Sequence, residues 1–433
     1  AEQFGTPLHV LDIDRLRANA RRAATELSVS YSGRSSVHYA MKANNTPAVV
    51  ATLREEGIAV EVMTEYELWL AIQSGYSGRD IIANGPCKSA QFIRACITSD
   101  VKAIIVDSPG EIERIELEAA TLDVRARVLL RINPDHTPRG MNSGSAMASR
   151  RGSPFGLDLV SGEVIAALDR CVSSPHIDFV GYHFHIGTGI RDSTEHARAF
   201  HRCTRLIRET LERGIDVRIV DIGGGFGIAT SRGFTTIEML RYEATGWLPS
   251  HSATPGTPAL REYVVHVGEE IERAFRGAAL PELIIEPGRW LVGGAQHLLL
   301  TIEYVKTRTG VGTWYITDGG VGTVSLPTWY EYHEVFSCDR PCAPRTDIVN
   351  IVGPGCFAGD IVYKNKPMQR MSEGETIAVM DSGAYFLALE SNFGHPRSAI
   401  VGIENGSPRV LRRREQLEEM VSRDIDYVNG GTP

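Results

Sequence analysis

From about residue 37 to residue 288 the sequence repeats one local pattern: a short apolar run rich in β-branched residues, then a longer segment with helical spacing. The strand candidates are Val37–Ala43, Ala59–Thr64, Asp80–Gly85, Lys102–Asp107, Arg127–Asn133, Phe179–Gly187, Arg218–Gly225 and Glu282–Gly288. Helix candidates between them include Pro47–Glu56, Glu65–Gly75, Ser89–Cys96, Pro109–Ala120 and Thr194–Arg213. This alternation predicts parallel strands joined by right-handed crossovers. Eight strands over about 250 residues fit a closed (β/α)8 TIM-like barrel, and a doubly wound open sheet is the alternative.

The pattern changes after about residue 290, where turn residues separate strand-like runs that have no long helical segments between them. These runs are Ala295–Val305, Thr313–Asp318, Thr346–Gly353, Ile361–Tyr363, Glu375–Gly383 and Ser398–Ile403. Such composition is typical of an antiparallel sheet, which the opening strand candidate Pro7–Asp12 could join. We therefore predict an α/β barrel over residues 28–288. Residues 1–27 and 289–433 are predicted to form an antiparallel domain, β-sandwich or β-barrel-like.

The 433 residues carry a net charge of −8, which offers no clustered basic excess for binding DNA or RNA. The basic run Arg412–Arg414 is followed at once by acidic residues, so a solvated face is favoured over a polyanion site. No apolar run approaches the roughly 18 residues of a membrane span, and the N-terminus lacks a signal pattern. The seven scattered cysteines indicate a reducing compartment. We expect a soluble, cytoplasmic protein.

Active sites of (β/α)8 barrels lie at the C-terminal ends of the strands, and the first predicted strand ends around Lys42. Desolvation among apolar strand residues favours the free amine that a Schiff-base lysine needs, although a strand-end lysine can also snorkel to water. His183 and His185 end the sixth strand, and a period of two places both inside the barrel. A His-x-His pair can bind a metal, but the later strand ends offer only Asp221 as a further ligand. We therefore predict no metal site.

The seventh and eighth strands end in residues suited to a phosphate. Gly223, Gly224 and Gly225 leave backbone N–H groups unshielded, as a phosphate site or a tight turn requires. Glu286 and Arg289 follow on the next strand. They form either a structural ion pair or a site in which the arginine holds phosphate and the carboxylate holds a ring nitrogen.

Cys356, between glycines in the second domain, is predicted to be an accessible thiol. Together with the strand-end residues, it completes a set comprising an amine, a phosphate cradle, a ring stacker, a carboxylate and a thiol. With this set the sequence resembles the barrel-type (fold type III) pyridoxal 5′-phosphate (PLP)-dependent decarboxylases, the family of diaminopimelate, ornithine and arginine decarboxylases, whose barrel is alanine racemase-like. The matching motifs run nearly end to end: Gly5–Leu8, Tyr39–Ala43, His183–Gly187, Gly223–Gly227, Glu286–Arg289, Asp318–Gly320, Cys356 with Gly359–Asp360, and Gly383–Tyr385.

The resemblance implies PLP as cofactor and decarboxylation of an amino acid. It makes Lys42 the Schiff-base lysine, stacks His185 on the ring, pairs Glu286 with the pyridine nitrogen and lets Cys356 protonate Cα. Further implied cofactor contacts are Glu61, Arg131, Thr188, Gly223, Gly224, Gly225, Arg289 and Tyr385, with Glu67 near the cofactor edge. Implied substrate contacts are Cys356, Phe357, Tyr385 and Glu331. Because Cys356 lies outside the barrel, the resemblance also implies a homodimer with shared active sites.

Two alternatives use the same scaffold: a PLP-dependent racemase, and a catalytically silent homologue that binds a protein partner as a regulator. A carboxylate at the pyridine nitrogen favours the protonated ring, which is a strong electron sink. Racemases of this fold present an arginine there, so Glu286 favours decarboxylation. The silent homologues typically lack the lysine or the thiol, whereas Lys42 and Cys356 are both present.

The sequence departs from the family at two substrate contacts. The acidic residue that commonly follows the cysteine, and binds a distal ammonium, is Phe357 here. The arginine that follows Asp-Gly-Gly in diaminopimelate decarboxylases is missing from Val321–Tyr330, although Glu331 could supply a carboxylate. A charged distal end left unpaired in a partly dry pocket costs several kcal/mol per ion. Asn84–Ser89, and Arg139–Asn142 leading to Pro154–Asp158, are similar to a branch acting in specialised metabolism. We expect an atypical substrate, such as a modified or carrier-protein-tethered amino acid.

Overall fold

The computed structural model describes residues 1–139, 148–249, 257–325 and 331–424. The chain divides into two compact units. The barrel unit comprises Leu16–Ala229 and Pro255–Leu291, and the sheet unit comprises Ala1–Arg15, Thr230–Thr254 and Val292–Pro433. Residues 230–254 lie within the sequence range of the strand–helix repeat, but they belong to the sheet unit.

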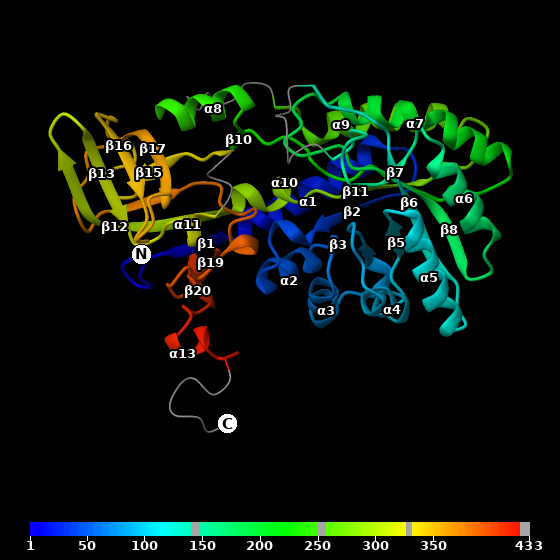
Figure 1. The fold of residues 1–433 in the computed structure, drawn as a ribbon, viewed down its shortest axis with the longest axis horizontal. Helices are drawn as coiled ribbons and strands as arrows, with labels where there is room; N and C mark the ends of the chain where they lie inside the picture. The colour runs from blue at the N-terminus through cyan, green and yellow to red at the C-terminus, as the bar shows by residue number, and fades with distance from the viewer. Residues whose placement is uncertain (140–147, 250–256, 326–330, 425–433) are drawn as a thin grey trace. The chain divides into compact units, whose positions relative to one another are not determined.

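Eight parallel strands form the barrel (Figure 1). They are β2 (Ser35–Ala40), β3 (Ala59–Val62), β4 (Ile81–Ala83), β5 (Ala103–Val106), β6 (Ala126–Asn133), β8 (Ile177–His183), β9 (Ile219–Asp221) and β11 (Glu282–Ile285). Each pairs with its neighbours in parallel, and β11 pairs with β2, which closes the sheet. The predicted barrel is confirmed and the open-sheet alternative is excluded. A short strand, β7 (Leu157–Asp158), adds to β6.

Most of the barrel strands end earlier than the sequence predicts, so that several residues assigned to strand ends lie in loops. The apolar alternation extends past the last ladder pair, and pattern alone does not mark where hydrogen bonding stops. The barrel interior is filled by alanine and branched aliphatic side chains from several strands, as is typical of this fold. They are Ile82, Ala103, Ile105, Leu129, Val180, Ile219 and Ile284.

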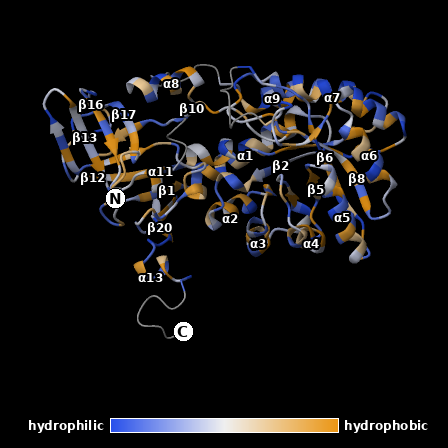
Figure 2. Cartoon of the chain, viewed as in Figure 1, coloured by the Kyte–Doolittle hydropathy of each residue, from blue (hydrophilic) through white to orange (hydrophobic). Residues whose placement is uncertain are grey.

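The helices of the barrel unit surround these strands. They are α1 (Ile13–Ser30), α2 (Pro47–Glu55), α3 (Glu65–Gln73), α4 (Ala90–Thr98), α5 (Pro109–Thr121), α6 (Glu163–Ser173), α7 (Glu195–Glu212) and α9 (Leu260–Ala274), with short turns η1 (Met41–Ala43) and η2 (Gly78–Asp80). Local signals explain where several begin: proline opens α2 and α5, and the Thr64 and Ser89 side chains cap α3 and α4. Figure 2 shows hydrophilic and hydrophobic residues alternating along α5–α7, as expected of helices with one buried face.

The sheet unit is built around a mostly antiparallel sheet. Its strands are β1 (Leu8–Asp12), β12 (Gln296–Arg308), β13 (Gly312–Thr317), β15 (Val335–Ser337), β16 (Asp347–Val352), β17 (Ile361–Met368), β18 (Thr376–Val379), β19 (Ala399–Glu404) and β20 (Ser407–Arg412). As predicted, the opening strand joins it: β1 pairs antiparallel with β12 and parallel with β19. The unit also contains β10 (Arg232–Gly233), which pairs with β14 (Glu331–Tyr332), and the helices α8 (Thr236–Thr245), α11 (Val321–Val324) and α13 (Leu417–Met420), with turns η3 (Gly293–Ala295) and η4 (Leu387–Leu389). The short helix α10 (Arg289–Val292) spans the boundary at Leu291, where the barrel unit ends.

Alternate residues of β12 and β18 supply the core of the sheet unit. Leu298 lies opposite Val379 and Leu300 opposite Ile377, and all four side chains are fully buried. Such cross-strand apolar pairs are the main stabilising contacts of a sheet. Among the described residues, no helix combines the length and the apolar character needed to cross a bilayer.

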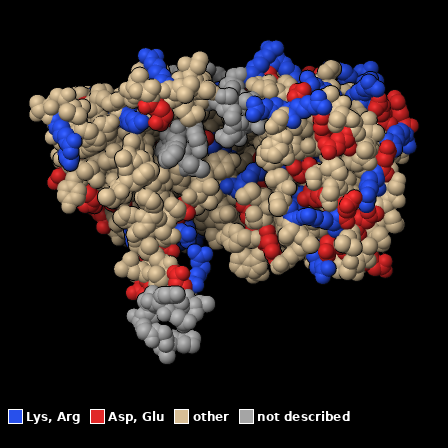
Figure 3. All heavy atoms as spheres, in the orientation of Figure 1, with Lys and Arg blue, Asp and Glu red and all other residues tan. Residues whose placement is uncertain are grey.

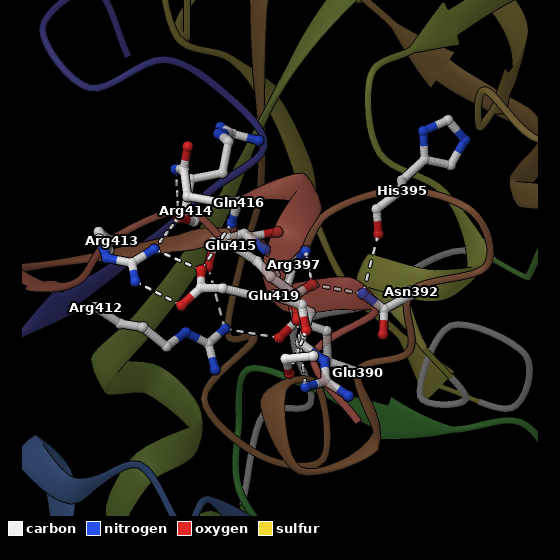
Figure 4. Close-up of polar contacts among 12 residues, drawn as sticks. Glu390, Asn392, His395, Arg397, Arg412, Arg413, Arg414, Glu415, Gln416 and Glu419 are labelled. Carbon is white, nitrogen blue, oxygen red and sulfur yellow. Dashed lines mark hydrogen bonds and ion pairs between the residues drawn. The ribbon is translucent and has the colours of Figure 1, made fainter. Parts of the chain in front are cut away.

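Each arginine of the C-terminal basic run has a partner nearby, and for Arg412 and Arg413 that partner is a carboxylate (Figure 4). Arg412 donates to Glu390 at 2.6 Å, Arg413 pairs with Glu419, and an Arg414 N–H donates to the Pro7 carbonyl at 3.0 Å. On the face shown in Figure 3, cationic and anionic side chains are likewise interspersed over the barrel unit. These contacts favour a structural role for the run.

Candidate active site

The amine of Lys42 meets a buried carboxylate at the C-terminal ends of β2 and β3. Lys42 lies in η1, directly after β2 rather than inside a strand, and its side chain is 32% exposed. Its Nζ donates to Oε2 of the buried Glu61 at 2.7 Å. Burial raises the pKa of Glu61, and the charge of Lys42 opposes that shift. Behind it, Glu67 accepts the Met63 N–H at 2.8 Å, and burial raises the pKa of Glu67 to about 7.

The turn after β9 brings strand ends together so closely that its positions require glycine. A Cβ on Gly224 would lie 2.1 Å from the Glu286 carbonyl oxygen, and one on Gly225 would lie 1.9 Å from that of Gly187. Gly225 also has a φ of +89°, which L side chains rarely adopt. Any residue other than glycine at position 224 or 225 would therefore clash with a backbone carbonyl.

Two of the three glycine N–H groups expected to be unshielded already have side-chain acceptors. Gly223 donates to Asp221 Oδ1 at 2.8 Å and Gly224 donates to His185 Nδ1 at 3.2 Å. The sequence pattern does not reveal these bonds, because the turn folds back on its own strand end and on the neighbouring loop. Thr188 follows His185 in that loop, and Arg289 begins α10, four residues after β11 ends at Ile285.

The two histidines of the sixth strand end occupy different settings. His183 is the last residue of β8 and is fully buried, whereas His185 lies two residues beyond the strand. Burial and the nearby charges of Lys42 and Arg131 lower the pKa of His185 well below its usual value. The ring is therefore neutral, consistent with Nδ1 accepting a hydrogen bond. A neutral imidazole presents a flat aromatic face that can stack on another ring.

His183, Asp221 and Glu286 form a buried cluster in which one nitrogen or oxygen atom from each lies within 4.8 Å of the others. His183 Nε2 is 3.6 Å from Glu286 Oε2. Within the described part of the chain, Asp221 Oδ2 and Glu286 Oε1 have no hydrogen-bond partner. Burial raises the pKa of both carboxyls, and the charge of Glu286 raises that of Asp221 further. From sequence, Asp221 was predicted only as a possible metal ligand; its place at a strand end, two residues before Gly223, was the available signal.

Arg131, near the end of β6, is held by a partner that the sequence analysis did not single out. Its Nη1 donates to Asp107 Oδ1 at 2.7 Å, and its guanidinium lies over the Phe155 ring at 4.6 Å. Glu111 in turn accepts the Asp107 N–H at 2.8 Å and pairs with Lys88 Nζ at 2.9 Å. Lys88 also donates to the carbonyls of Gly85 and Ile105, so its buried ammonium has three acceptors inside the protein.

We expect Glu111→Ala to lower the free energy of unfolding by about 3–5 kcal/mol, because it leaves the buried Lys88 ammonium without a counter-charge. The double variant Lys88→Met/Glu111→Leu should recover most of the loss, since it removes both charges. Urea unfolding measures both, with Glu113→Ala, an exposed residue of the same helix, as the matched control. Equal destabilisation by the Glu111 and Glu113 variants would contradict this account.

The other predicted site residues belong to the sheet unit. The loop that carries Cys356 is held by Asp360, whose carboxylate accepts the N–H groups of Gly355 at 2.7 Å and Val321 at 2.6 Å. The thiol residue is exposed, as the sequence predicts. The Phe357 ring lies edge-on to that of Phe393, with centroids 6.0 Å apart.

Glu331 and Tyr385 are the remaining residues of that group. Glu331 opens β14, and its Oε2 lies 3.4 Å from His333 Nε2, so it has a partner inside its own unit. Tyr385 has a φ of +66°. Residues 326–330, part of the stretch compared with the distal-carboxylate arginine, and residues 140–147 lie outside the described residues.

Known proteins that are similar to this chain identify its family. The family model for the pyridoxal binding domain of pyridoxal-dependent decarboxylases matches residues 13–293, and that for their C-terminal sheet domain matches residues 263–383. The chain belongs to the pyridoxal-dependent decarboxylase family. This enzyme is a PLP-dependent amino-acid decarboxylase, as its sequence predicts.

Its relatives include diaminopimelate decarboxylases. That of Bacillus subtilis is 30% identical over 438 residues, covering 99% of this chain and 94% of the relative; that of Methanocaldococcus jannaschii is 28% identical, covering 98% and 92%. The crystal structure of the M. jannaschii enzyme has a TM-score of 0.87 at 26% identity, covering 99% of this chain and 94% of that one. The same enzyme in complex with L-lysine has a TM-score of 0.85.

The residues present fit the cofactor of this family. Glu286 Oε1 is a buried acceptor without a protein partner, which suits a protonated ring nitrogen. The turn at Gly224 and Gly225 admits no Cβ, because the backbone carbonyls of Glu286 and Gly187 occupy those positions, so only backbone lines this strand end. Lys42 supplies the amine beside them. The Glu286 carboxylate suits the ring nitrogen of PLP, and the Lys42 amine suits its aldehyde.

Proposed function

We propose that the strand-end residues of the barrel unit hold PLP and that Cys356 supplies the proton that replaces the lost carboxylate. The residues assigned to the cofactor are Lys42, Glu61, Arg131, His185, Thr188, Gly223, Gly224, Gly225, Glu286, Arg289 and, from the sheet unit, Tyr385. The buried, partnerless Glu286 oxygen is the observation that carries the proposal. When bound, PLP accepts the electron pair that remains at the substrate Cα after carbon dioxide leaves.

Each side chain then has a separate task. Lys42 holds the cofactor aldehyde covalently, and Glu61 keeps its amine in place. Glu286 holds the ring nitrogen, and its negative charge favours the protonated ring. His185 and Arg131 hold the ring, while Thr188, the glycine turn, Arg289 and Tyr385 hold the phosphate. The exposed Cys356 thiol gives a proton to Cα, a task that needs access to substrate rather than burial.

We further propose that the substrate has an uncharged distal end, as in a modified or carrier-protein-tethered amino acid. Phe357 is 50% exposed beside Cys356 and stands where members of the family carry an acidic residue. With Phe393, which is also exposed, it forms an apolar surface next to the thiol. Such a surface gains from burying apolar groups and cannot pair an ammonium. Glu331, already beside His333, is the weaker candidate for a substrate contact.

A panel of amino acids tests this substrate class. The measured quantity is kcat/KM for carbon dioxide release. We expect it to be at least about 100-fold higher for amino acids with neutral distal ends, free or carrier-tethered, than for diaminopimelate, lysine or ornithine. Phe357→Glu should raise kcat/KM for lysine by about tenfold or more, because it supplies a counter-charge. Tyr304→Glu, an exposed aromatic replacement elsewhere in the sheet unit, is the control. Ordinary turnover of diaminopimelate or lysine by the unaltered enzyme would overturn the proposal.

We also propose a homodimer with shared active sites. The supporting observation is that Cys356 belongs to the sheet unit, whereas Lys42 belongs to the barrel unit. An exposed aromatic pair on α3, Tyr66 stacked on Trp69 at 6.2 Å, offers apolar surface of the kind that interfaces use. We also propose a cytoplasmic location. The supporting observation is the set of seven scattered cysteines, which is typical of a reducing compartment.

A further inference from the structure

Two buried carboxyl groups face each other beneath the proposed ring-nitrogen site. Asp221 is fully buried at the end of β9 and Glu286 follows β11, the neighbouring strand. Asp221 Oδ1 is satisfied by the Gly223 N–H, but Asp221 Oδ2 and Glu286 Oε1 have no hydrogen-bond partner among the described residues. The two groups lie within 4.8 Å of each other, together with His183.

Two ionised carboxylates at this separation repel strongly in a dry interior, and two acceptor oxygens cannot satisfy each other without a proton between them. His183 does not resolve the conflict. Burial lowers its pKa well below the usual value, so it carries no charge, and its Nε2 lies 3.6 Å from Glu286. Glu61 adds a further negative charge nearby. One proton shared by the pair gives Asp221 Oδ2 a partner and occupies one lone pair of Glu286 Oε1, whose other lone pair stays available to the ring nitrogen.

The surroundings decide which carboxyl keeps the charge. Burial raises the pKa of Glu286, but the charges of Lys42 and Arg131 oppose that rise and so favour its ionised form. For Asp221, burial and the adjacent Glu286 charge both favour the un-ionised acid. The geometry agrees, because the Oδ1 of Asp221 acts as a carbonyl acceptor and leaves Oδ2 to carry the proton.

We propose that Asp221 is held as the un-ionised acid and donates a hydrogen bond from Oδ2 to Glu286, which makes Asp221 a positioning residue for the cofactor's ring nitrogen. The inference rests on the proposed role of Glu286 and extends it. Asp221 fixes one face of the Glu286 carboxylate and leaves a single negative charge at this position. Without that donor, Glu286 loses a hydrogen bond and is free to turn from the ring.

Asp221→Asn is the sharpest test, because asparagine keeps a carbonyl for the Gly223 N–H and an N–H donor for Glu286. We expect its affinity for PLP, measured by titrating the apoenzyme, to stay within about threefold of wild type. Asp221→Ala loses the donor, and its affinity should fall by about 10- to 100-fold. If Asp221 served only to accept the Gly223 N–H, its carboxyl would not need a proton. The second measurement therefore detects that proton directly, by infrared spectroscopy. The infrared carbonyl band of an un-ionised carboxyl, recorded on apoenzyme, should disappear in Asp221→Asn.

The outcomes separate cleanly. If the apoenzyme spectrum of wild type contains no un-ionised carboxyl band that Asp221→Asn removes, the proton-sharing inference is wrong, whatever the cofactor does. If Asn and Ala weaken PLP binding equally, Asp221 acts as an ionised group and the inference also fails. A metal ion that remains stoichiometric after chelation and is lost in Asp221→Asn would overturn it too. If the band behaves as expected but Glu286→Gln leaves the cofactor unchanged, the proposed function fails instead. Should Asp221→Ala not fold, the Asn variant and the infrared band still decide.

Discussion

Replacing Lys42 with alanine is expected to lower the decarboxylation rate by on the order of 10³-fold or more. The amine is the group proposed to hold the cofactor covalently, and it is hydrogen-bonded to the buried Glu61 at a strand end. The variant should still bind PLP non-covalently, because the ring and phosphate contacts are untouched. Its absorbance should therefore shift away from that of the covalently attached form.

Borohydride reduction followed by peptide mapping provides the direct measurement. In the unaltered enzyme the pyridoxyl label should lie on the peptide that contains Lys42, and in the variant no lysine should carry it. Lys102→Ala serves as a control, since Lys102 pairs with Glu282 at the opposite, N-terminal ends of the strands. A wild-type rate for Lys42→Ala would remove the basis for every other cofactor assignment.

The same variant tests whether active sites are shared. Mixing Lys42→Ala with Cys356→Ala protein should restore up to about a quarter of the wild-type rate, because half of the dimers are then mixed and each carries one intact site. No recovery after subunit exchange would indicate that the lysine and the thiol serve one site within a single chain.

Glu286→Gln is expected to lower kcat by about 10²- to 10³-fold with a much smaller change in KM. Glutamine is nearly isosteric, so substrate binding is retained. It carries no charge, so it no longer favours the protonated cofactor ring that draws electrons from Cα. The glutamine variant also has no charge for Asp221 to share a proton with.

Steady-state kinetics measures this split, and nitrogen NMR of labelled cofactor reports the protonation of its ring. Glu282→Gln, at the start of the same strand, is the matched control, because it lies at the far end of β11. An unchanged kcat, with the ring nitrogen still protonated, would mean that Glu286 is only a structural acid.

Much of the candidate site was accessible from sequence because strand ends in a barrel are functional positions. Lys42, His185, Glu286 and the glycine turn all follow β-branched apolar runs, and each side chain carries a recognisable chemistry. The pattern was less informative about where strands stop. Lys42 was expected inside a strand and lies in η1, because ladder hydrogen bonding ends before the apolar alternation does.

What the amino-acid sequence alone determined is the order of strands and helices, the barrel followed by a mostly antiparallel sheet domain, and the chemical groups that mark a pyridoxal-dependent decarboxylase. Only the tertiary structure decided which of those groups meet. Asp107 holds Arg131, and Asp221 faces Glu286, because closing the barrel brings together the ends of strands that are far apart along the chain. Local pattern cannot encode such pairs, since burial and charge at each strand end depend on its neighbours around the barrel.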